Sequence, residues 1–355
     1  MKKEILGLFI TDIHITKDNG GLIKSLFAQI FDVCQSRNIK RIFCGGDVFT
    51  NRTGQPLSCL DDFQFIVNAA AEKNIYLCLI PGNHDKTDPD DERSYLDFFH
   101  SPNYHLSRVG ELITFGDIVA IAMIPYFTDE RWIREYEKIM EMIKYKHKTG
   151  DLQEGATTIL ITHSGFDGVI NNDGSRVESI IKPSMFKDWS KVLIGHYHNA
   201  SKLSKNVIYT GSICQKDFGE TYEDKGATIV YLDGSLQHVS LDFPKYLKET
   251  LDVNDKERLR ELLEKYEGNT KDRIRFIFSG KKCDATKIDT AELSKRGIEA
   301  KFKADEIEEA ITSSESETMM CYDKKSIQKD FVKFCSENFI KGKHLKYGLK
   351  LIKEL

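Results

Sequence analysis

Apolar and polar positions alternate along the first 245 residues in a way that predicts short strands separated by helices. The continuously apolar runs, typical of strands buried on both faces, are 5–10, 41–43 and 75–80. The segments between them, with apolar residues at helical spacing, are 20–36 and 58–73. This βαβαβ order predicts an α/β fold in which helices cover both faces of a sheet.

The same alternation continues to residue 243 and ends in a hairpin. A long amphipathic segment predicts a helix over 129–148. Further strands are predicted at 117–124, 156–162, 191–195, 206–211, 226–232 and 235–243. Asp233-Gly234 separates the last two strands, and this dipeptide strongly favours a tight hairpin turn.

A smaller pattern follows Pro244 and predicts a separate α+β domain over 246–303. Its expected elements are a helix at 254–267, a strand at 273–279, a helix at 284–296 and a strand at 298–303. Residues 304–322 are acidic and rich in Ser and Thr, which is typical of a linker. Residues 323–355 predict two short amphipathic helices. The first domain therefore spans 1–245, and three smaller parts follow it.

Composition and charge narrow the class of protein. Of the 355 residues, 40% are hydrophobic, which is ordinary for a globular chain and excludes a mainly disordered one. No uncharged apolar run reaches about 18 residues, so we expect no membrane span, and the N-terminus does not resemble a signal peptide. The eight cysteines form no C-x-x-C pair, which predicts reduced thiols in a cytoplasmic protein. The net charge of −4 shows no excess of basic residues that would favour binding to nucleic acid.

Polar residues follow the predicted strands at the points where the strands end. They are Asp12, His14, Asp47, Asn83, His84, Asp85, His163, His196 and His198. Open α/β sheets bind ligands at this carboxyl edge. In D-x-H and H-x-H on extended backbone, alternate side chains point the same way, so each pair can converge on one site. Imidazoles, carboxylates and an Asn carbonyl suit two Mn, Fe or Zn ions, with Asp47 able to bridge them.

Each motif alone has an ordinary explanation. A lone D-x-H or H-x-H is common, and Gly-Asp after a strand is usually a turn. Gly82-Asn83-His84-Asp85 is rarer, and the full ordered set at successive strand ends favours a metal site.

Together these motifs resemble the signature of the calcineurin-like metallophosphoesterases over residues 1 to about 245. The resemblance implies a layered α/β/β/α sandwich with a small α+β capping domain and C-terminal partner-binding helices. Within the family, the chain is most similar to the DNA-repair nuclease branch, which includes bacterial SbcD and a tailed-phage recombination endonuclease subunit. The residues that carry this finer match are Tyr209-Thr210-Gly211-Ser212, Phe218-Gly219-Glu220 and Lys225-Gly226.

The resemblance also implies a role for each motif residue. The ligands of the first metal would be Asp12, His14, Asp47 and His198, and those of the second would be Asp47, Asn83, His163 and His196. Manganese is the expected metal. His84 would face the scissile phosphate as a catalytic residue, oriented by Asp85. Thr50 stands where some members of the branch carry a second histidine, which bears on how the nucleotide is held.

The implied activity is a manganese-dependent 3′–5′ exonuclease on duplex ends and a single-strand endonuclease. It would act in recombination, repair or phage DNA processing, in the cytoplasm of a bacterial or phage-infected cell. Candidate DNA contacts are Arg52, Lys86, Arg93, Arg176 and Lys216. Three alternatives stay open: a protein Ser/Thr phosphatase, a small-molecule or cyclic-nucleotide phosphodiesterase, and a scaffold that has lost catalysis.

The C-terminal segment predicts a partner. Its apolar stripes are Ile327, Phe331, Phe334, Ile340, Leu345, Leu349 and Ile352. From Asp323 onward there are nine Lys against four Asp or Glu, a net charge of +5 that suits an acidic partner helix or nearby DNA. The stripes could instead pack on their own domain. The resemblance implies an SbcC-type coiled-coil ATPase as the partner, and it leaves a homodimer open.

Overall fold

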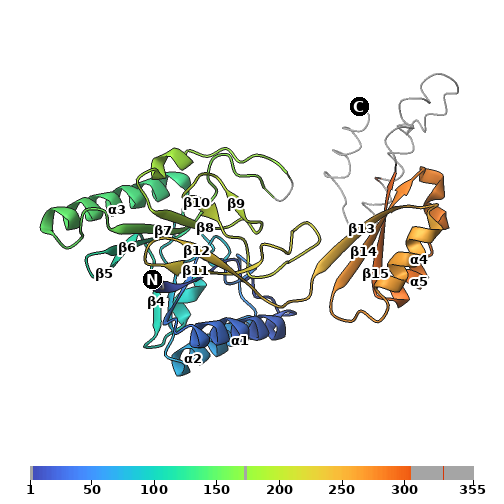
Figure 1. Cartoon of the computed structure of the whole chain (residues 1–355), viewed down its shortest axis with the longest axis horizontal. Coiled ribbons are helices and arrows are strands. Elements are labelled where there is room, and N and C mark those ends of the chain that lie inside the picture. The colour runs from blue at the N-terminus through green and yellow to red at the C-terminus, as the bar shows by residue number, and fades with distance from the viewer. Residues whose placement is uncertain (1–2, 172–173, 305–330, 332–355) are drawn as a thin grey trace, which may run out of the picture. The chain divides into compact units, whose positions relative to one another are not determined.

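The computed structural model describes residues 3–171 and 174–304, together with the isolated Phe331. Two six-stranded sheets form the first domain (Figure 1). The first sheet has the order β12 (Leu236–Ser240), β11 (Gly226–Tyr231), β1 (Ile5–Ile10), β2 (Arg41–Cys44), β3 (Tyr76–Leu79), β4 (Tyr104–Leu106). The second has the order β5 (Glu111–Phe115), β6 (Val119–Ile124), β7 (Thr157–His163), β8 (Lys191–Gly195), β10 (Val207–Tyr209), β9 (Ser201–Lys202).

The central strands of each sheet are parallel, so their carboxyl ends share one edge. Strands β1 to β4 run parallel in the first sheet, and β6, β7, β8 and β10 do so in the second. The hairpin partners β11 and β12 pair antiparallel across Asp233-Gly234, as predicted. Gly234 has φ 74°, a left-handed conformation that glycine adopts without steric cost.

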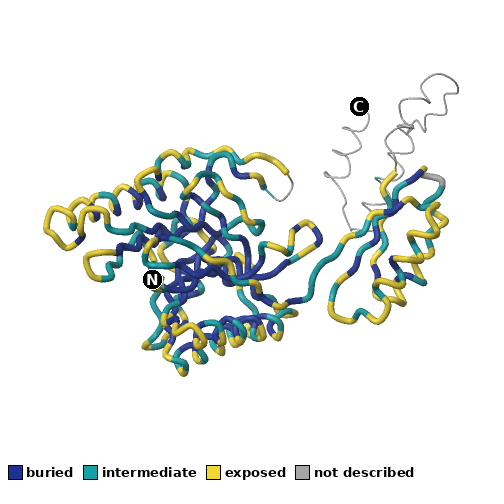
Figure 2. Tube along the Cα trace, in the orientation of Figure 1, coloured by how far each residue is buried: buried dark blue, intermediate teal, exposed yellow. Residues whose placement is uncertain are grey.

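The two sheets pack face to face, and helices cover their outer faces. Helices α1 (Gly20–Ser36) and α2 (Leu57–Glu72) pack on the first sheet, and α3 (Asp129–Thr149) packs on the second (Figure 1). A separate core of inward-facing side chains from both sheets includes Phe9, Phe43, Ile121, Ile161 and Leu193. Figure 2 shows these central strands as the most buried part of the domain. The α/β/β/α sandwich is thereby confirmed.

One expectation from the hydrophobic pattern is wrong. The continuous apolar runs predicted a sheet covered by helices on both faces. The strands are indeed buried on both faces, but by helices on one side and by the other sheet on the other. A strand pattern reports burial without identifying the covering element. Strands β4, β5 and β9 were also not predicted, because they are short or half-exposed and few of their residues are buried.

A three-stranded sheet follows, in the order β13 (Tyr246–Asp252), β14 (Arg273–Gly280), β15 (Ile298–Ala304). Its helices are α4 (Lys256–Lys265) and α5 (Thr290–Lys295). Strand β13 was not predicted. The predicted helix 284–296 is divided into a 3₁₀ turn, Lys282–Lys287, and α5, because the Asp289 side chain accepts from the N–H of Glu292 and starts a new helix.

The described residues divide into two compact units. The larger takes in residues 1–251, 255–277 and 289–301, and the other includes 252–254 and 278–288. The boundary at residue 245 stays a prediction. The linker 304–322 lies outside the described residues beyond Ala304, and so do the tail residues Ile327, Phe334, Ile340, Leu345, Leu349 and Ile352.

Two further expectations concern thiols and membranes. Cys34, Cys44, Cys59, Cys78 and Cys214 are free and buried. Burial raises the pKa of Cys34 to about 12 and that of Cys78 to about 11, so these thiols stay protonated. Within the described ranges, no helix has both the length and the apolar character that a bilayer crossing needs.

Candidate metal centre

The predicted ligands converge at the shared carboxyl edge of the two sheets. Asp12 and His14 follow β1, Asp47 follows β2, and Asn83 follows β3. From the second sheet, His163 ends β7, and His196 and His198 follow β8. Two groups of ligand atoms form, each within 4.8 Å: Asp12, His14 and His198 in the first, and Asp47, His163 and His196 in the second.

The backbone at four of the predicted ligands, Asp12, His14, Asp47 and His196, is left-handed, so the expected extended backbone of D-x-H and H-x-H is wrong. Asp12, His14 and Asp47 have φ of 55°, 53° and 53°. Left-handed backbone at non-glycine residues costs about 1–3 kcal/mol each and clusters at functional sites. Cross-loop hydrogen bonds hold it here, with the N–H of Asp12 donating to Gly46 O (3.0 Å) and that of His14 to Asp47 O (3.0 Å).

Close approach between loops explains the glycines of two motifs. A Cβ on Gly82 would lie 2.2 Å from Asp47 Oδ1, and a Cβ on Gly195 would lie 2.1 Å from Thr11 Oγ1. Any side chain at either position would push the ligand loops apart. Both motif glycines therefore permit the loops to meet.

We call the group of Asp12, His14 and His198 the first half-site. His14 Nε2 lies 3.0 Å from His198 Nε2 and 3.8 Å from Asp12 Oδ1. The Asp12 carboxylate also accepts from the N–H of His196 (3.1 Å). Asp12 and His14 are fully buried, and His198 is partly exposed.

The second half-site is formed by Asp47, Asn83, His163 and His196. Asn83 Oδ1 lies 3.0 Å from His163 Nε2 and 2.9 Å from His196 Nδ1. Asp47 Oδ2 lies 3.4 Å from His163 Nε2 and also 3.6 Å from His14 Nε2 of the first half-site. One carboxylate oxygen of Asp47, Oδ2, therefore faces both half-sites, as a bridging ligand would.

The chemistry of these groups fits divalent cations. The Asn83 oxygen faces two ring nitrogens, although turning the amide around would let its nitrogen donate to both. Lone pairs that converge in this way suit a shared cation. Burial lowers the pKa of His14 and of His196 to about 4, which leaves these imidazoles neutral and able to bind metal.

The carboxylates create a strongly negative field at the centre. Burial alone would raise the pKa of Asp47, but His163 and His14 outweigh it and hold that pKa well below its ordinary value. Burial would lower the pKa of His163, but Asp47 raises it to about 9. The field that draws a proton onto His163 also favours a metal cation at the same place.

The sequence predicts that Asp85 orients His84, and the structure shows that this is wrong. The Asp85 carboxylate accepts from the backbone N–H groups of Gly82 (2.9 Å), Phe49 (3.0 Å) and Val48 (3.3 Å). The His84 ring instead bonds through Nδ1 to the carbonyl oxygen of Thr50. Asp85 therefore ties two ligand loops together, and burial raises its pKa to about 7.

Replacing Asp85 with alanine should consequently destabilise the protein. Three buried N–H groups would lose their acceptor, and each unsatisfied group costs about 1–3 kcal/mol. Denaturant unfolding of the metal-free chain measures this loss. Unchanged stability together with a reduced turnover would return Asp85 to the role of orienting His84.

His84 is half-buried at the rim of the centre. Its backbone N–H donates to Asp47 Oδ1 (2.8 Å), and its ring meets that of His14 edge-on, with centroids 5.1 Å apart. Burial lowers the pKa of His84. The side chain lies beside the first half-site without belonging to either group of ligands.

The five candidate DNA contacts fall in different places. The Arg52 guanidinium lies against the Asn83 amide. The positive charges of Arg52 and Lys216 both contribute to lowering the pKa of His84, after burial. Lys86 is 2% exposed, and its Nζ donates to Tyr126 O (2.8 Å) above the Phe127 ring. Lys86 as a DNA contact is therefore wrong for this conformation.

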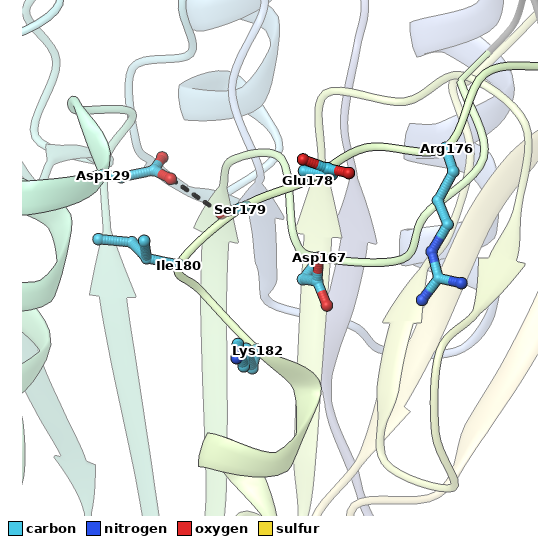
Figure 3. Close-up of a pocket in the computed structure, with 7 residues that line it drawn as sticks. All are labelled: Asp129, Asp167, Arg176, Glu178, Ser179, Ile180 and Lys182. Carbon is cyan, nitrogen blue, oxygen red and sulfur yellow. Dashed lines mark hydrogen bonds between the residues drawn. The ribbon is translucent and has the colours of Figure 1, made fainter.

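The remaining two basic residues are Arg93 and Arg176. Arg93 is exposed and pairs with Asp91 (3.3 Å). Arg176 lines a surface pocket of about 920 Å³ together with Asp129, Asp167, Glu178, Ser179, Ile180 and Lys182 (Figure 3). No metal ligand of either half-site lines this pocket, and its side chains carry both signs of charge.

Sequence reasoning assigned no role to three residues that support the ligands. Tyr126 stacks on the His196 ring, with centroids 5.9 Å apart. Glu220 contacts His198, and Lys225 contacts Glu220. Glu220 and Lys225 lie in the segments that carry the finer family resemblance. That resemblance was the one signal in the sequence that could have pointed to their role.

Comparisons with known proteins identify the family. The chain is 27% identical over 215 residues to the SbcD subunit of the SbcCD nuclease from Staphylococcus saprophyticus, covering 54% of this chain and 56% of that protein. It is 22% identical over 291 residues to protein 078R of Invertebrate iridescent virus 3, named as a phosphoesterase, covering 79% and 77%. The chain thus spans little more than half the length of the staphylococcal subunit. The family model of the calcineurin-like phosphoesterases matches residues 8–200, and the chain belongs to that family.

Proposed function

We propose that this protein is a manganese-dependent DNA nuclease, the nuclease subunit of an SbcCD-type complex. The observation that carries the proposal is the pair of half-sites facing one oxygen of Asp47, in a chain similar to the staphylococcal nuclease subunit. When bound, two divalent cations polarise a phosphodiester and activate water. The imidazole-rich donor set supports manganese, with iron or zinc as alternatives.

The residues of the chain have separate tasks in this proposal. The seven predicted ligands would hold the cations, and Asp47 would serve both half-sites. Arg52 and Lys216 supply positive charge beside the centre, which suits the phosphate backbone of DNA. His84 in its charged form would donate the Nε2 proton to the leaving 3′ oxygen, while the Thr50 carbonyl holds the ring through Nδ1. Burial lowers the pKa of His84, and Asp47 and the Thr50 carbonyl work against burial because both favour that charged form.

The test uses the full-length protein with labelled linear duplex and single-stranded circles, with and without Mn²⁺. Manganese-dependent cleavage of either substrate supports the proposal. Cyclic nucleotides and a nitrophenyl phosphomonoester serve as competing substrates. Hydrolysis of those compounds without cleavage of DNA would favour a small-molecule phosphodiesterase or a phosphatase. Two bound cations without any hydrolysis would favour a scaffold.

The C-terminal segment is proposed to bind an SbcC-type coiled-coil ATPase. Its net charge of +5 and its apolar stripes support this partner. The complex would act in the cytoplasm of a bacterial or phage-infected cell, and self-association into a homodimer is compatible with it.

Deleting residues 323–355 should leave a folded, metal-loaded nuclease that no longer co-purifies with the ATPase. Thermal unfolding, metal content and co-purification give the three measurements. Loss of the thermal transition would instead assign these residues to the core of the protein.

A further inference from the structure

A buried ion pair lies directly behind one predicted metal ligand. The side chains of Glu220 and Lys225 are 2% and 0% exposed. Glu220 Oε1 lies 2.7 Å from His198 Nδ1, and Glu220 Oε2 lies 3.1 Å from Lys225 Nζ. The backbone N–H of Lys216 donates to the same Oε2 (3.2 Å). Both carboxylate oxygens therefore have polar partners.

Lys225 also binds the backbone of the same ligand. Its Nζ donates to the carbonyl oxygen of His198 and lies 3.4 Å from Asn199 Oδ1. The pair thus holds His198 at two points, the ring through Glu220 and the main chain through Lys225. Rotation of the imidazole away from the first half-site would break the contact with Glu220.

Stability alone is a poor explanation of this arrangement. Burying two charges costs desolvation, and well-packed apolar residues of similar volume often stabilise a protein as well or better. A carboxylate behind a metal-binding imidazole has a specific effect, however. It keeps the proton on Nδ1, leaves Nε2 free for the metal and fixes the orientation of the ring. Here Nε2 of His198 is the atom that faces His14.

The other imidazoles have weaker support. His163 Nδ1 bonds to a neutral carbonyl, Gly45 O, at 2.7 Å. His14 Nδ1 is buried and has no hydrogen-bond partner among the described residues. Of these three rings, His198 alone is backed by a carboxylate in the described part of the chain. The first half-site is therefore the one that the ion pair can tune.

We infer that Glu220, held by Lys225, is a positioning residue that fixes His198 and sets the affinity of the first half-site for a divalent cation. The second half-site is independent of it. The inference rests on the two-cation part of the proposed function and not on DNA as the substrate.

The experiment titrates Mn²⁺ into metal-stripped, full-length protein by calorimetry. Glu220→Gln keeps the shape of the side chain and removes its charge. One of two binding events should weaken about 10–100-fold, the usual effect of losing such a partner. Glu111→Gln is the matched control, because Glu111 pairs with His105 (2.8 Å) and neither residue is a ligand. It should bind both cations as the wild type does.

Two further variants assign the effect. Asp12→Asn should weaken the first half-site and leave one tightly bound cation, and the affinity of that cation should not change when Glu220→Gln is added. Lys225→Met should weaken the same event as Glu220→Gln, and it provides the readout if Glu220→Gln does not fold.

Three results would overturn the inference. The first is that Glu220→Gln weakens both binding events equally and lowers the unfolding temperature of the metal-free protein, which indicates a structural role. The second is that Glu220→Gln changes neither binding event. The third is that the wild type binds fewer than two cations. A wild type that binds two cations but leaves DNA intact would refute the nuclease proposal and leave this inference testable.

Discussion

Replacing Asp47 with alanine should remove both cations together and reduce phosphodiester hydrolysis to background. The reason is that one carboxylate oxygen faces His14 at 3.6 Å and His163 at 3.4 Å, so both half-sites lose a ligand. Metal content after gel filtration, measured by elemental analysis, checks the first part, and hydrolysis of a nitrophenyl phosphodiester checks the second. Asp151→Ala, at an exposed aspartate, is the control and should retain both cations.

Backbone strain has to be separated from loss of the ligand. Asp47 has φ 53°, and an alanine tolerates this conformation less well than Asp or Asn does. Asp47→Asn keeps the local preference and removes only the charge. It should still bind manganese weakly, and it should lose the stability that the pairing of Asp47 with His163 contributes to the metal-free protein. Any further loss of stability in Asp47→Ala measures the backbone strain. Two cations bound tightly in either variant would contradict the bridging assignment.

Replacing His84 with alanine should preserve both cations and slow DNA cleavage by about 10²–10⁴, the usual contribution of a general acid. His84 lies beside the first half-site but outside both groups of ligands. Single-turnover cleavage of labelled duplex measures the loss. The loss should be smaller on a nitrophenyl phosphodiester, because that leaving group needs no proton.

The comparison of substrates decides the role of His84. Equal slowing on both substrates would make His84 a binding residue, and an emptied half-site would make it a ligand. Thr50 offers a further check, because its backbone carbonyl holds the ring. Thr50→Ala keeps that carbonyl and should leave the rate on DNA within a few-fold of the wild type.

Local sequence patterns were sufficient for most elements. Strands β1, β6, β7, β8 and β11 and helices α1, α2 and α3 lie within a few residues of their predicted bounds. Their apolar periodicity is strong, because each buries a whole face or a whole strand. The convergence of the candidate ligands within each sheet was also predictable, because side chains at the ends of parallel strands meet at one edge of their sheet. That the two edges lie together follows only from the packing of the two sheets.

The arrangement of the layers depended on long-range packing. The apolar runs of β2 and β7 would be equally suited to a helix or a second sheet as a neighbour, and only the tertiary structure shows the sheet-on-sheet core that contains Phe43 and Ile161. The left-handed backbone at Asp12 and His14 was equally hidden. Hydrogen bonds from another loop impose it, and no local pattern encodes it.

The motifs were enough to predict the candidate metal ligands, whereas long-range packing selected the residues that support them. Asp85 is next to His84 in the chain, yet its carboxylate binds backbone N–H groups of Val48 and Phe49 from another loop. Lys86 adjoins the same motif and is buried under Tyr126 and Phe127. Supporting contacts join residues that are distant in sequence, and burial and the available partners select them, so the identity of a residue alone cannot reveal its role.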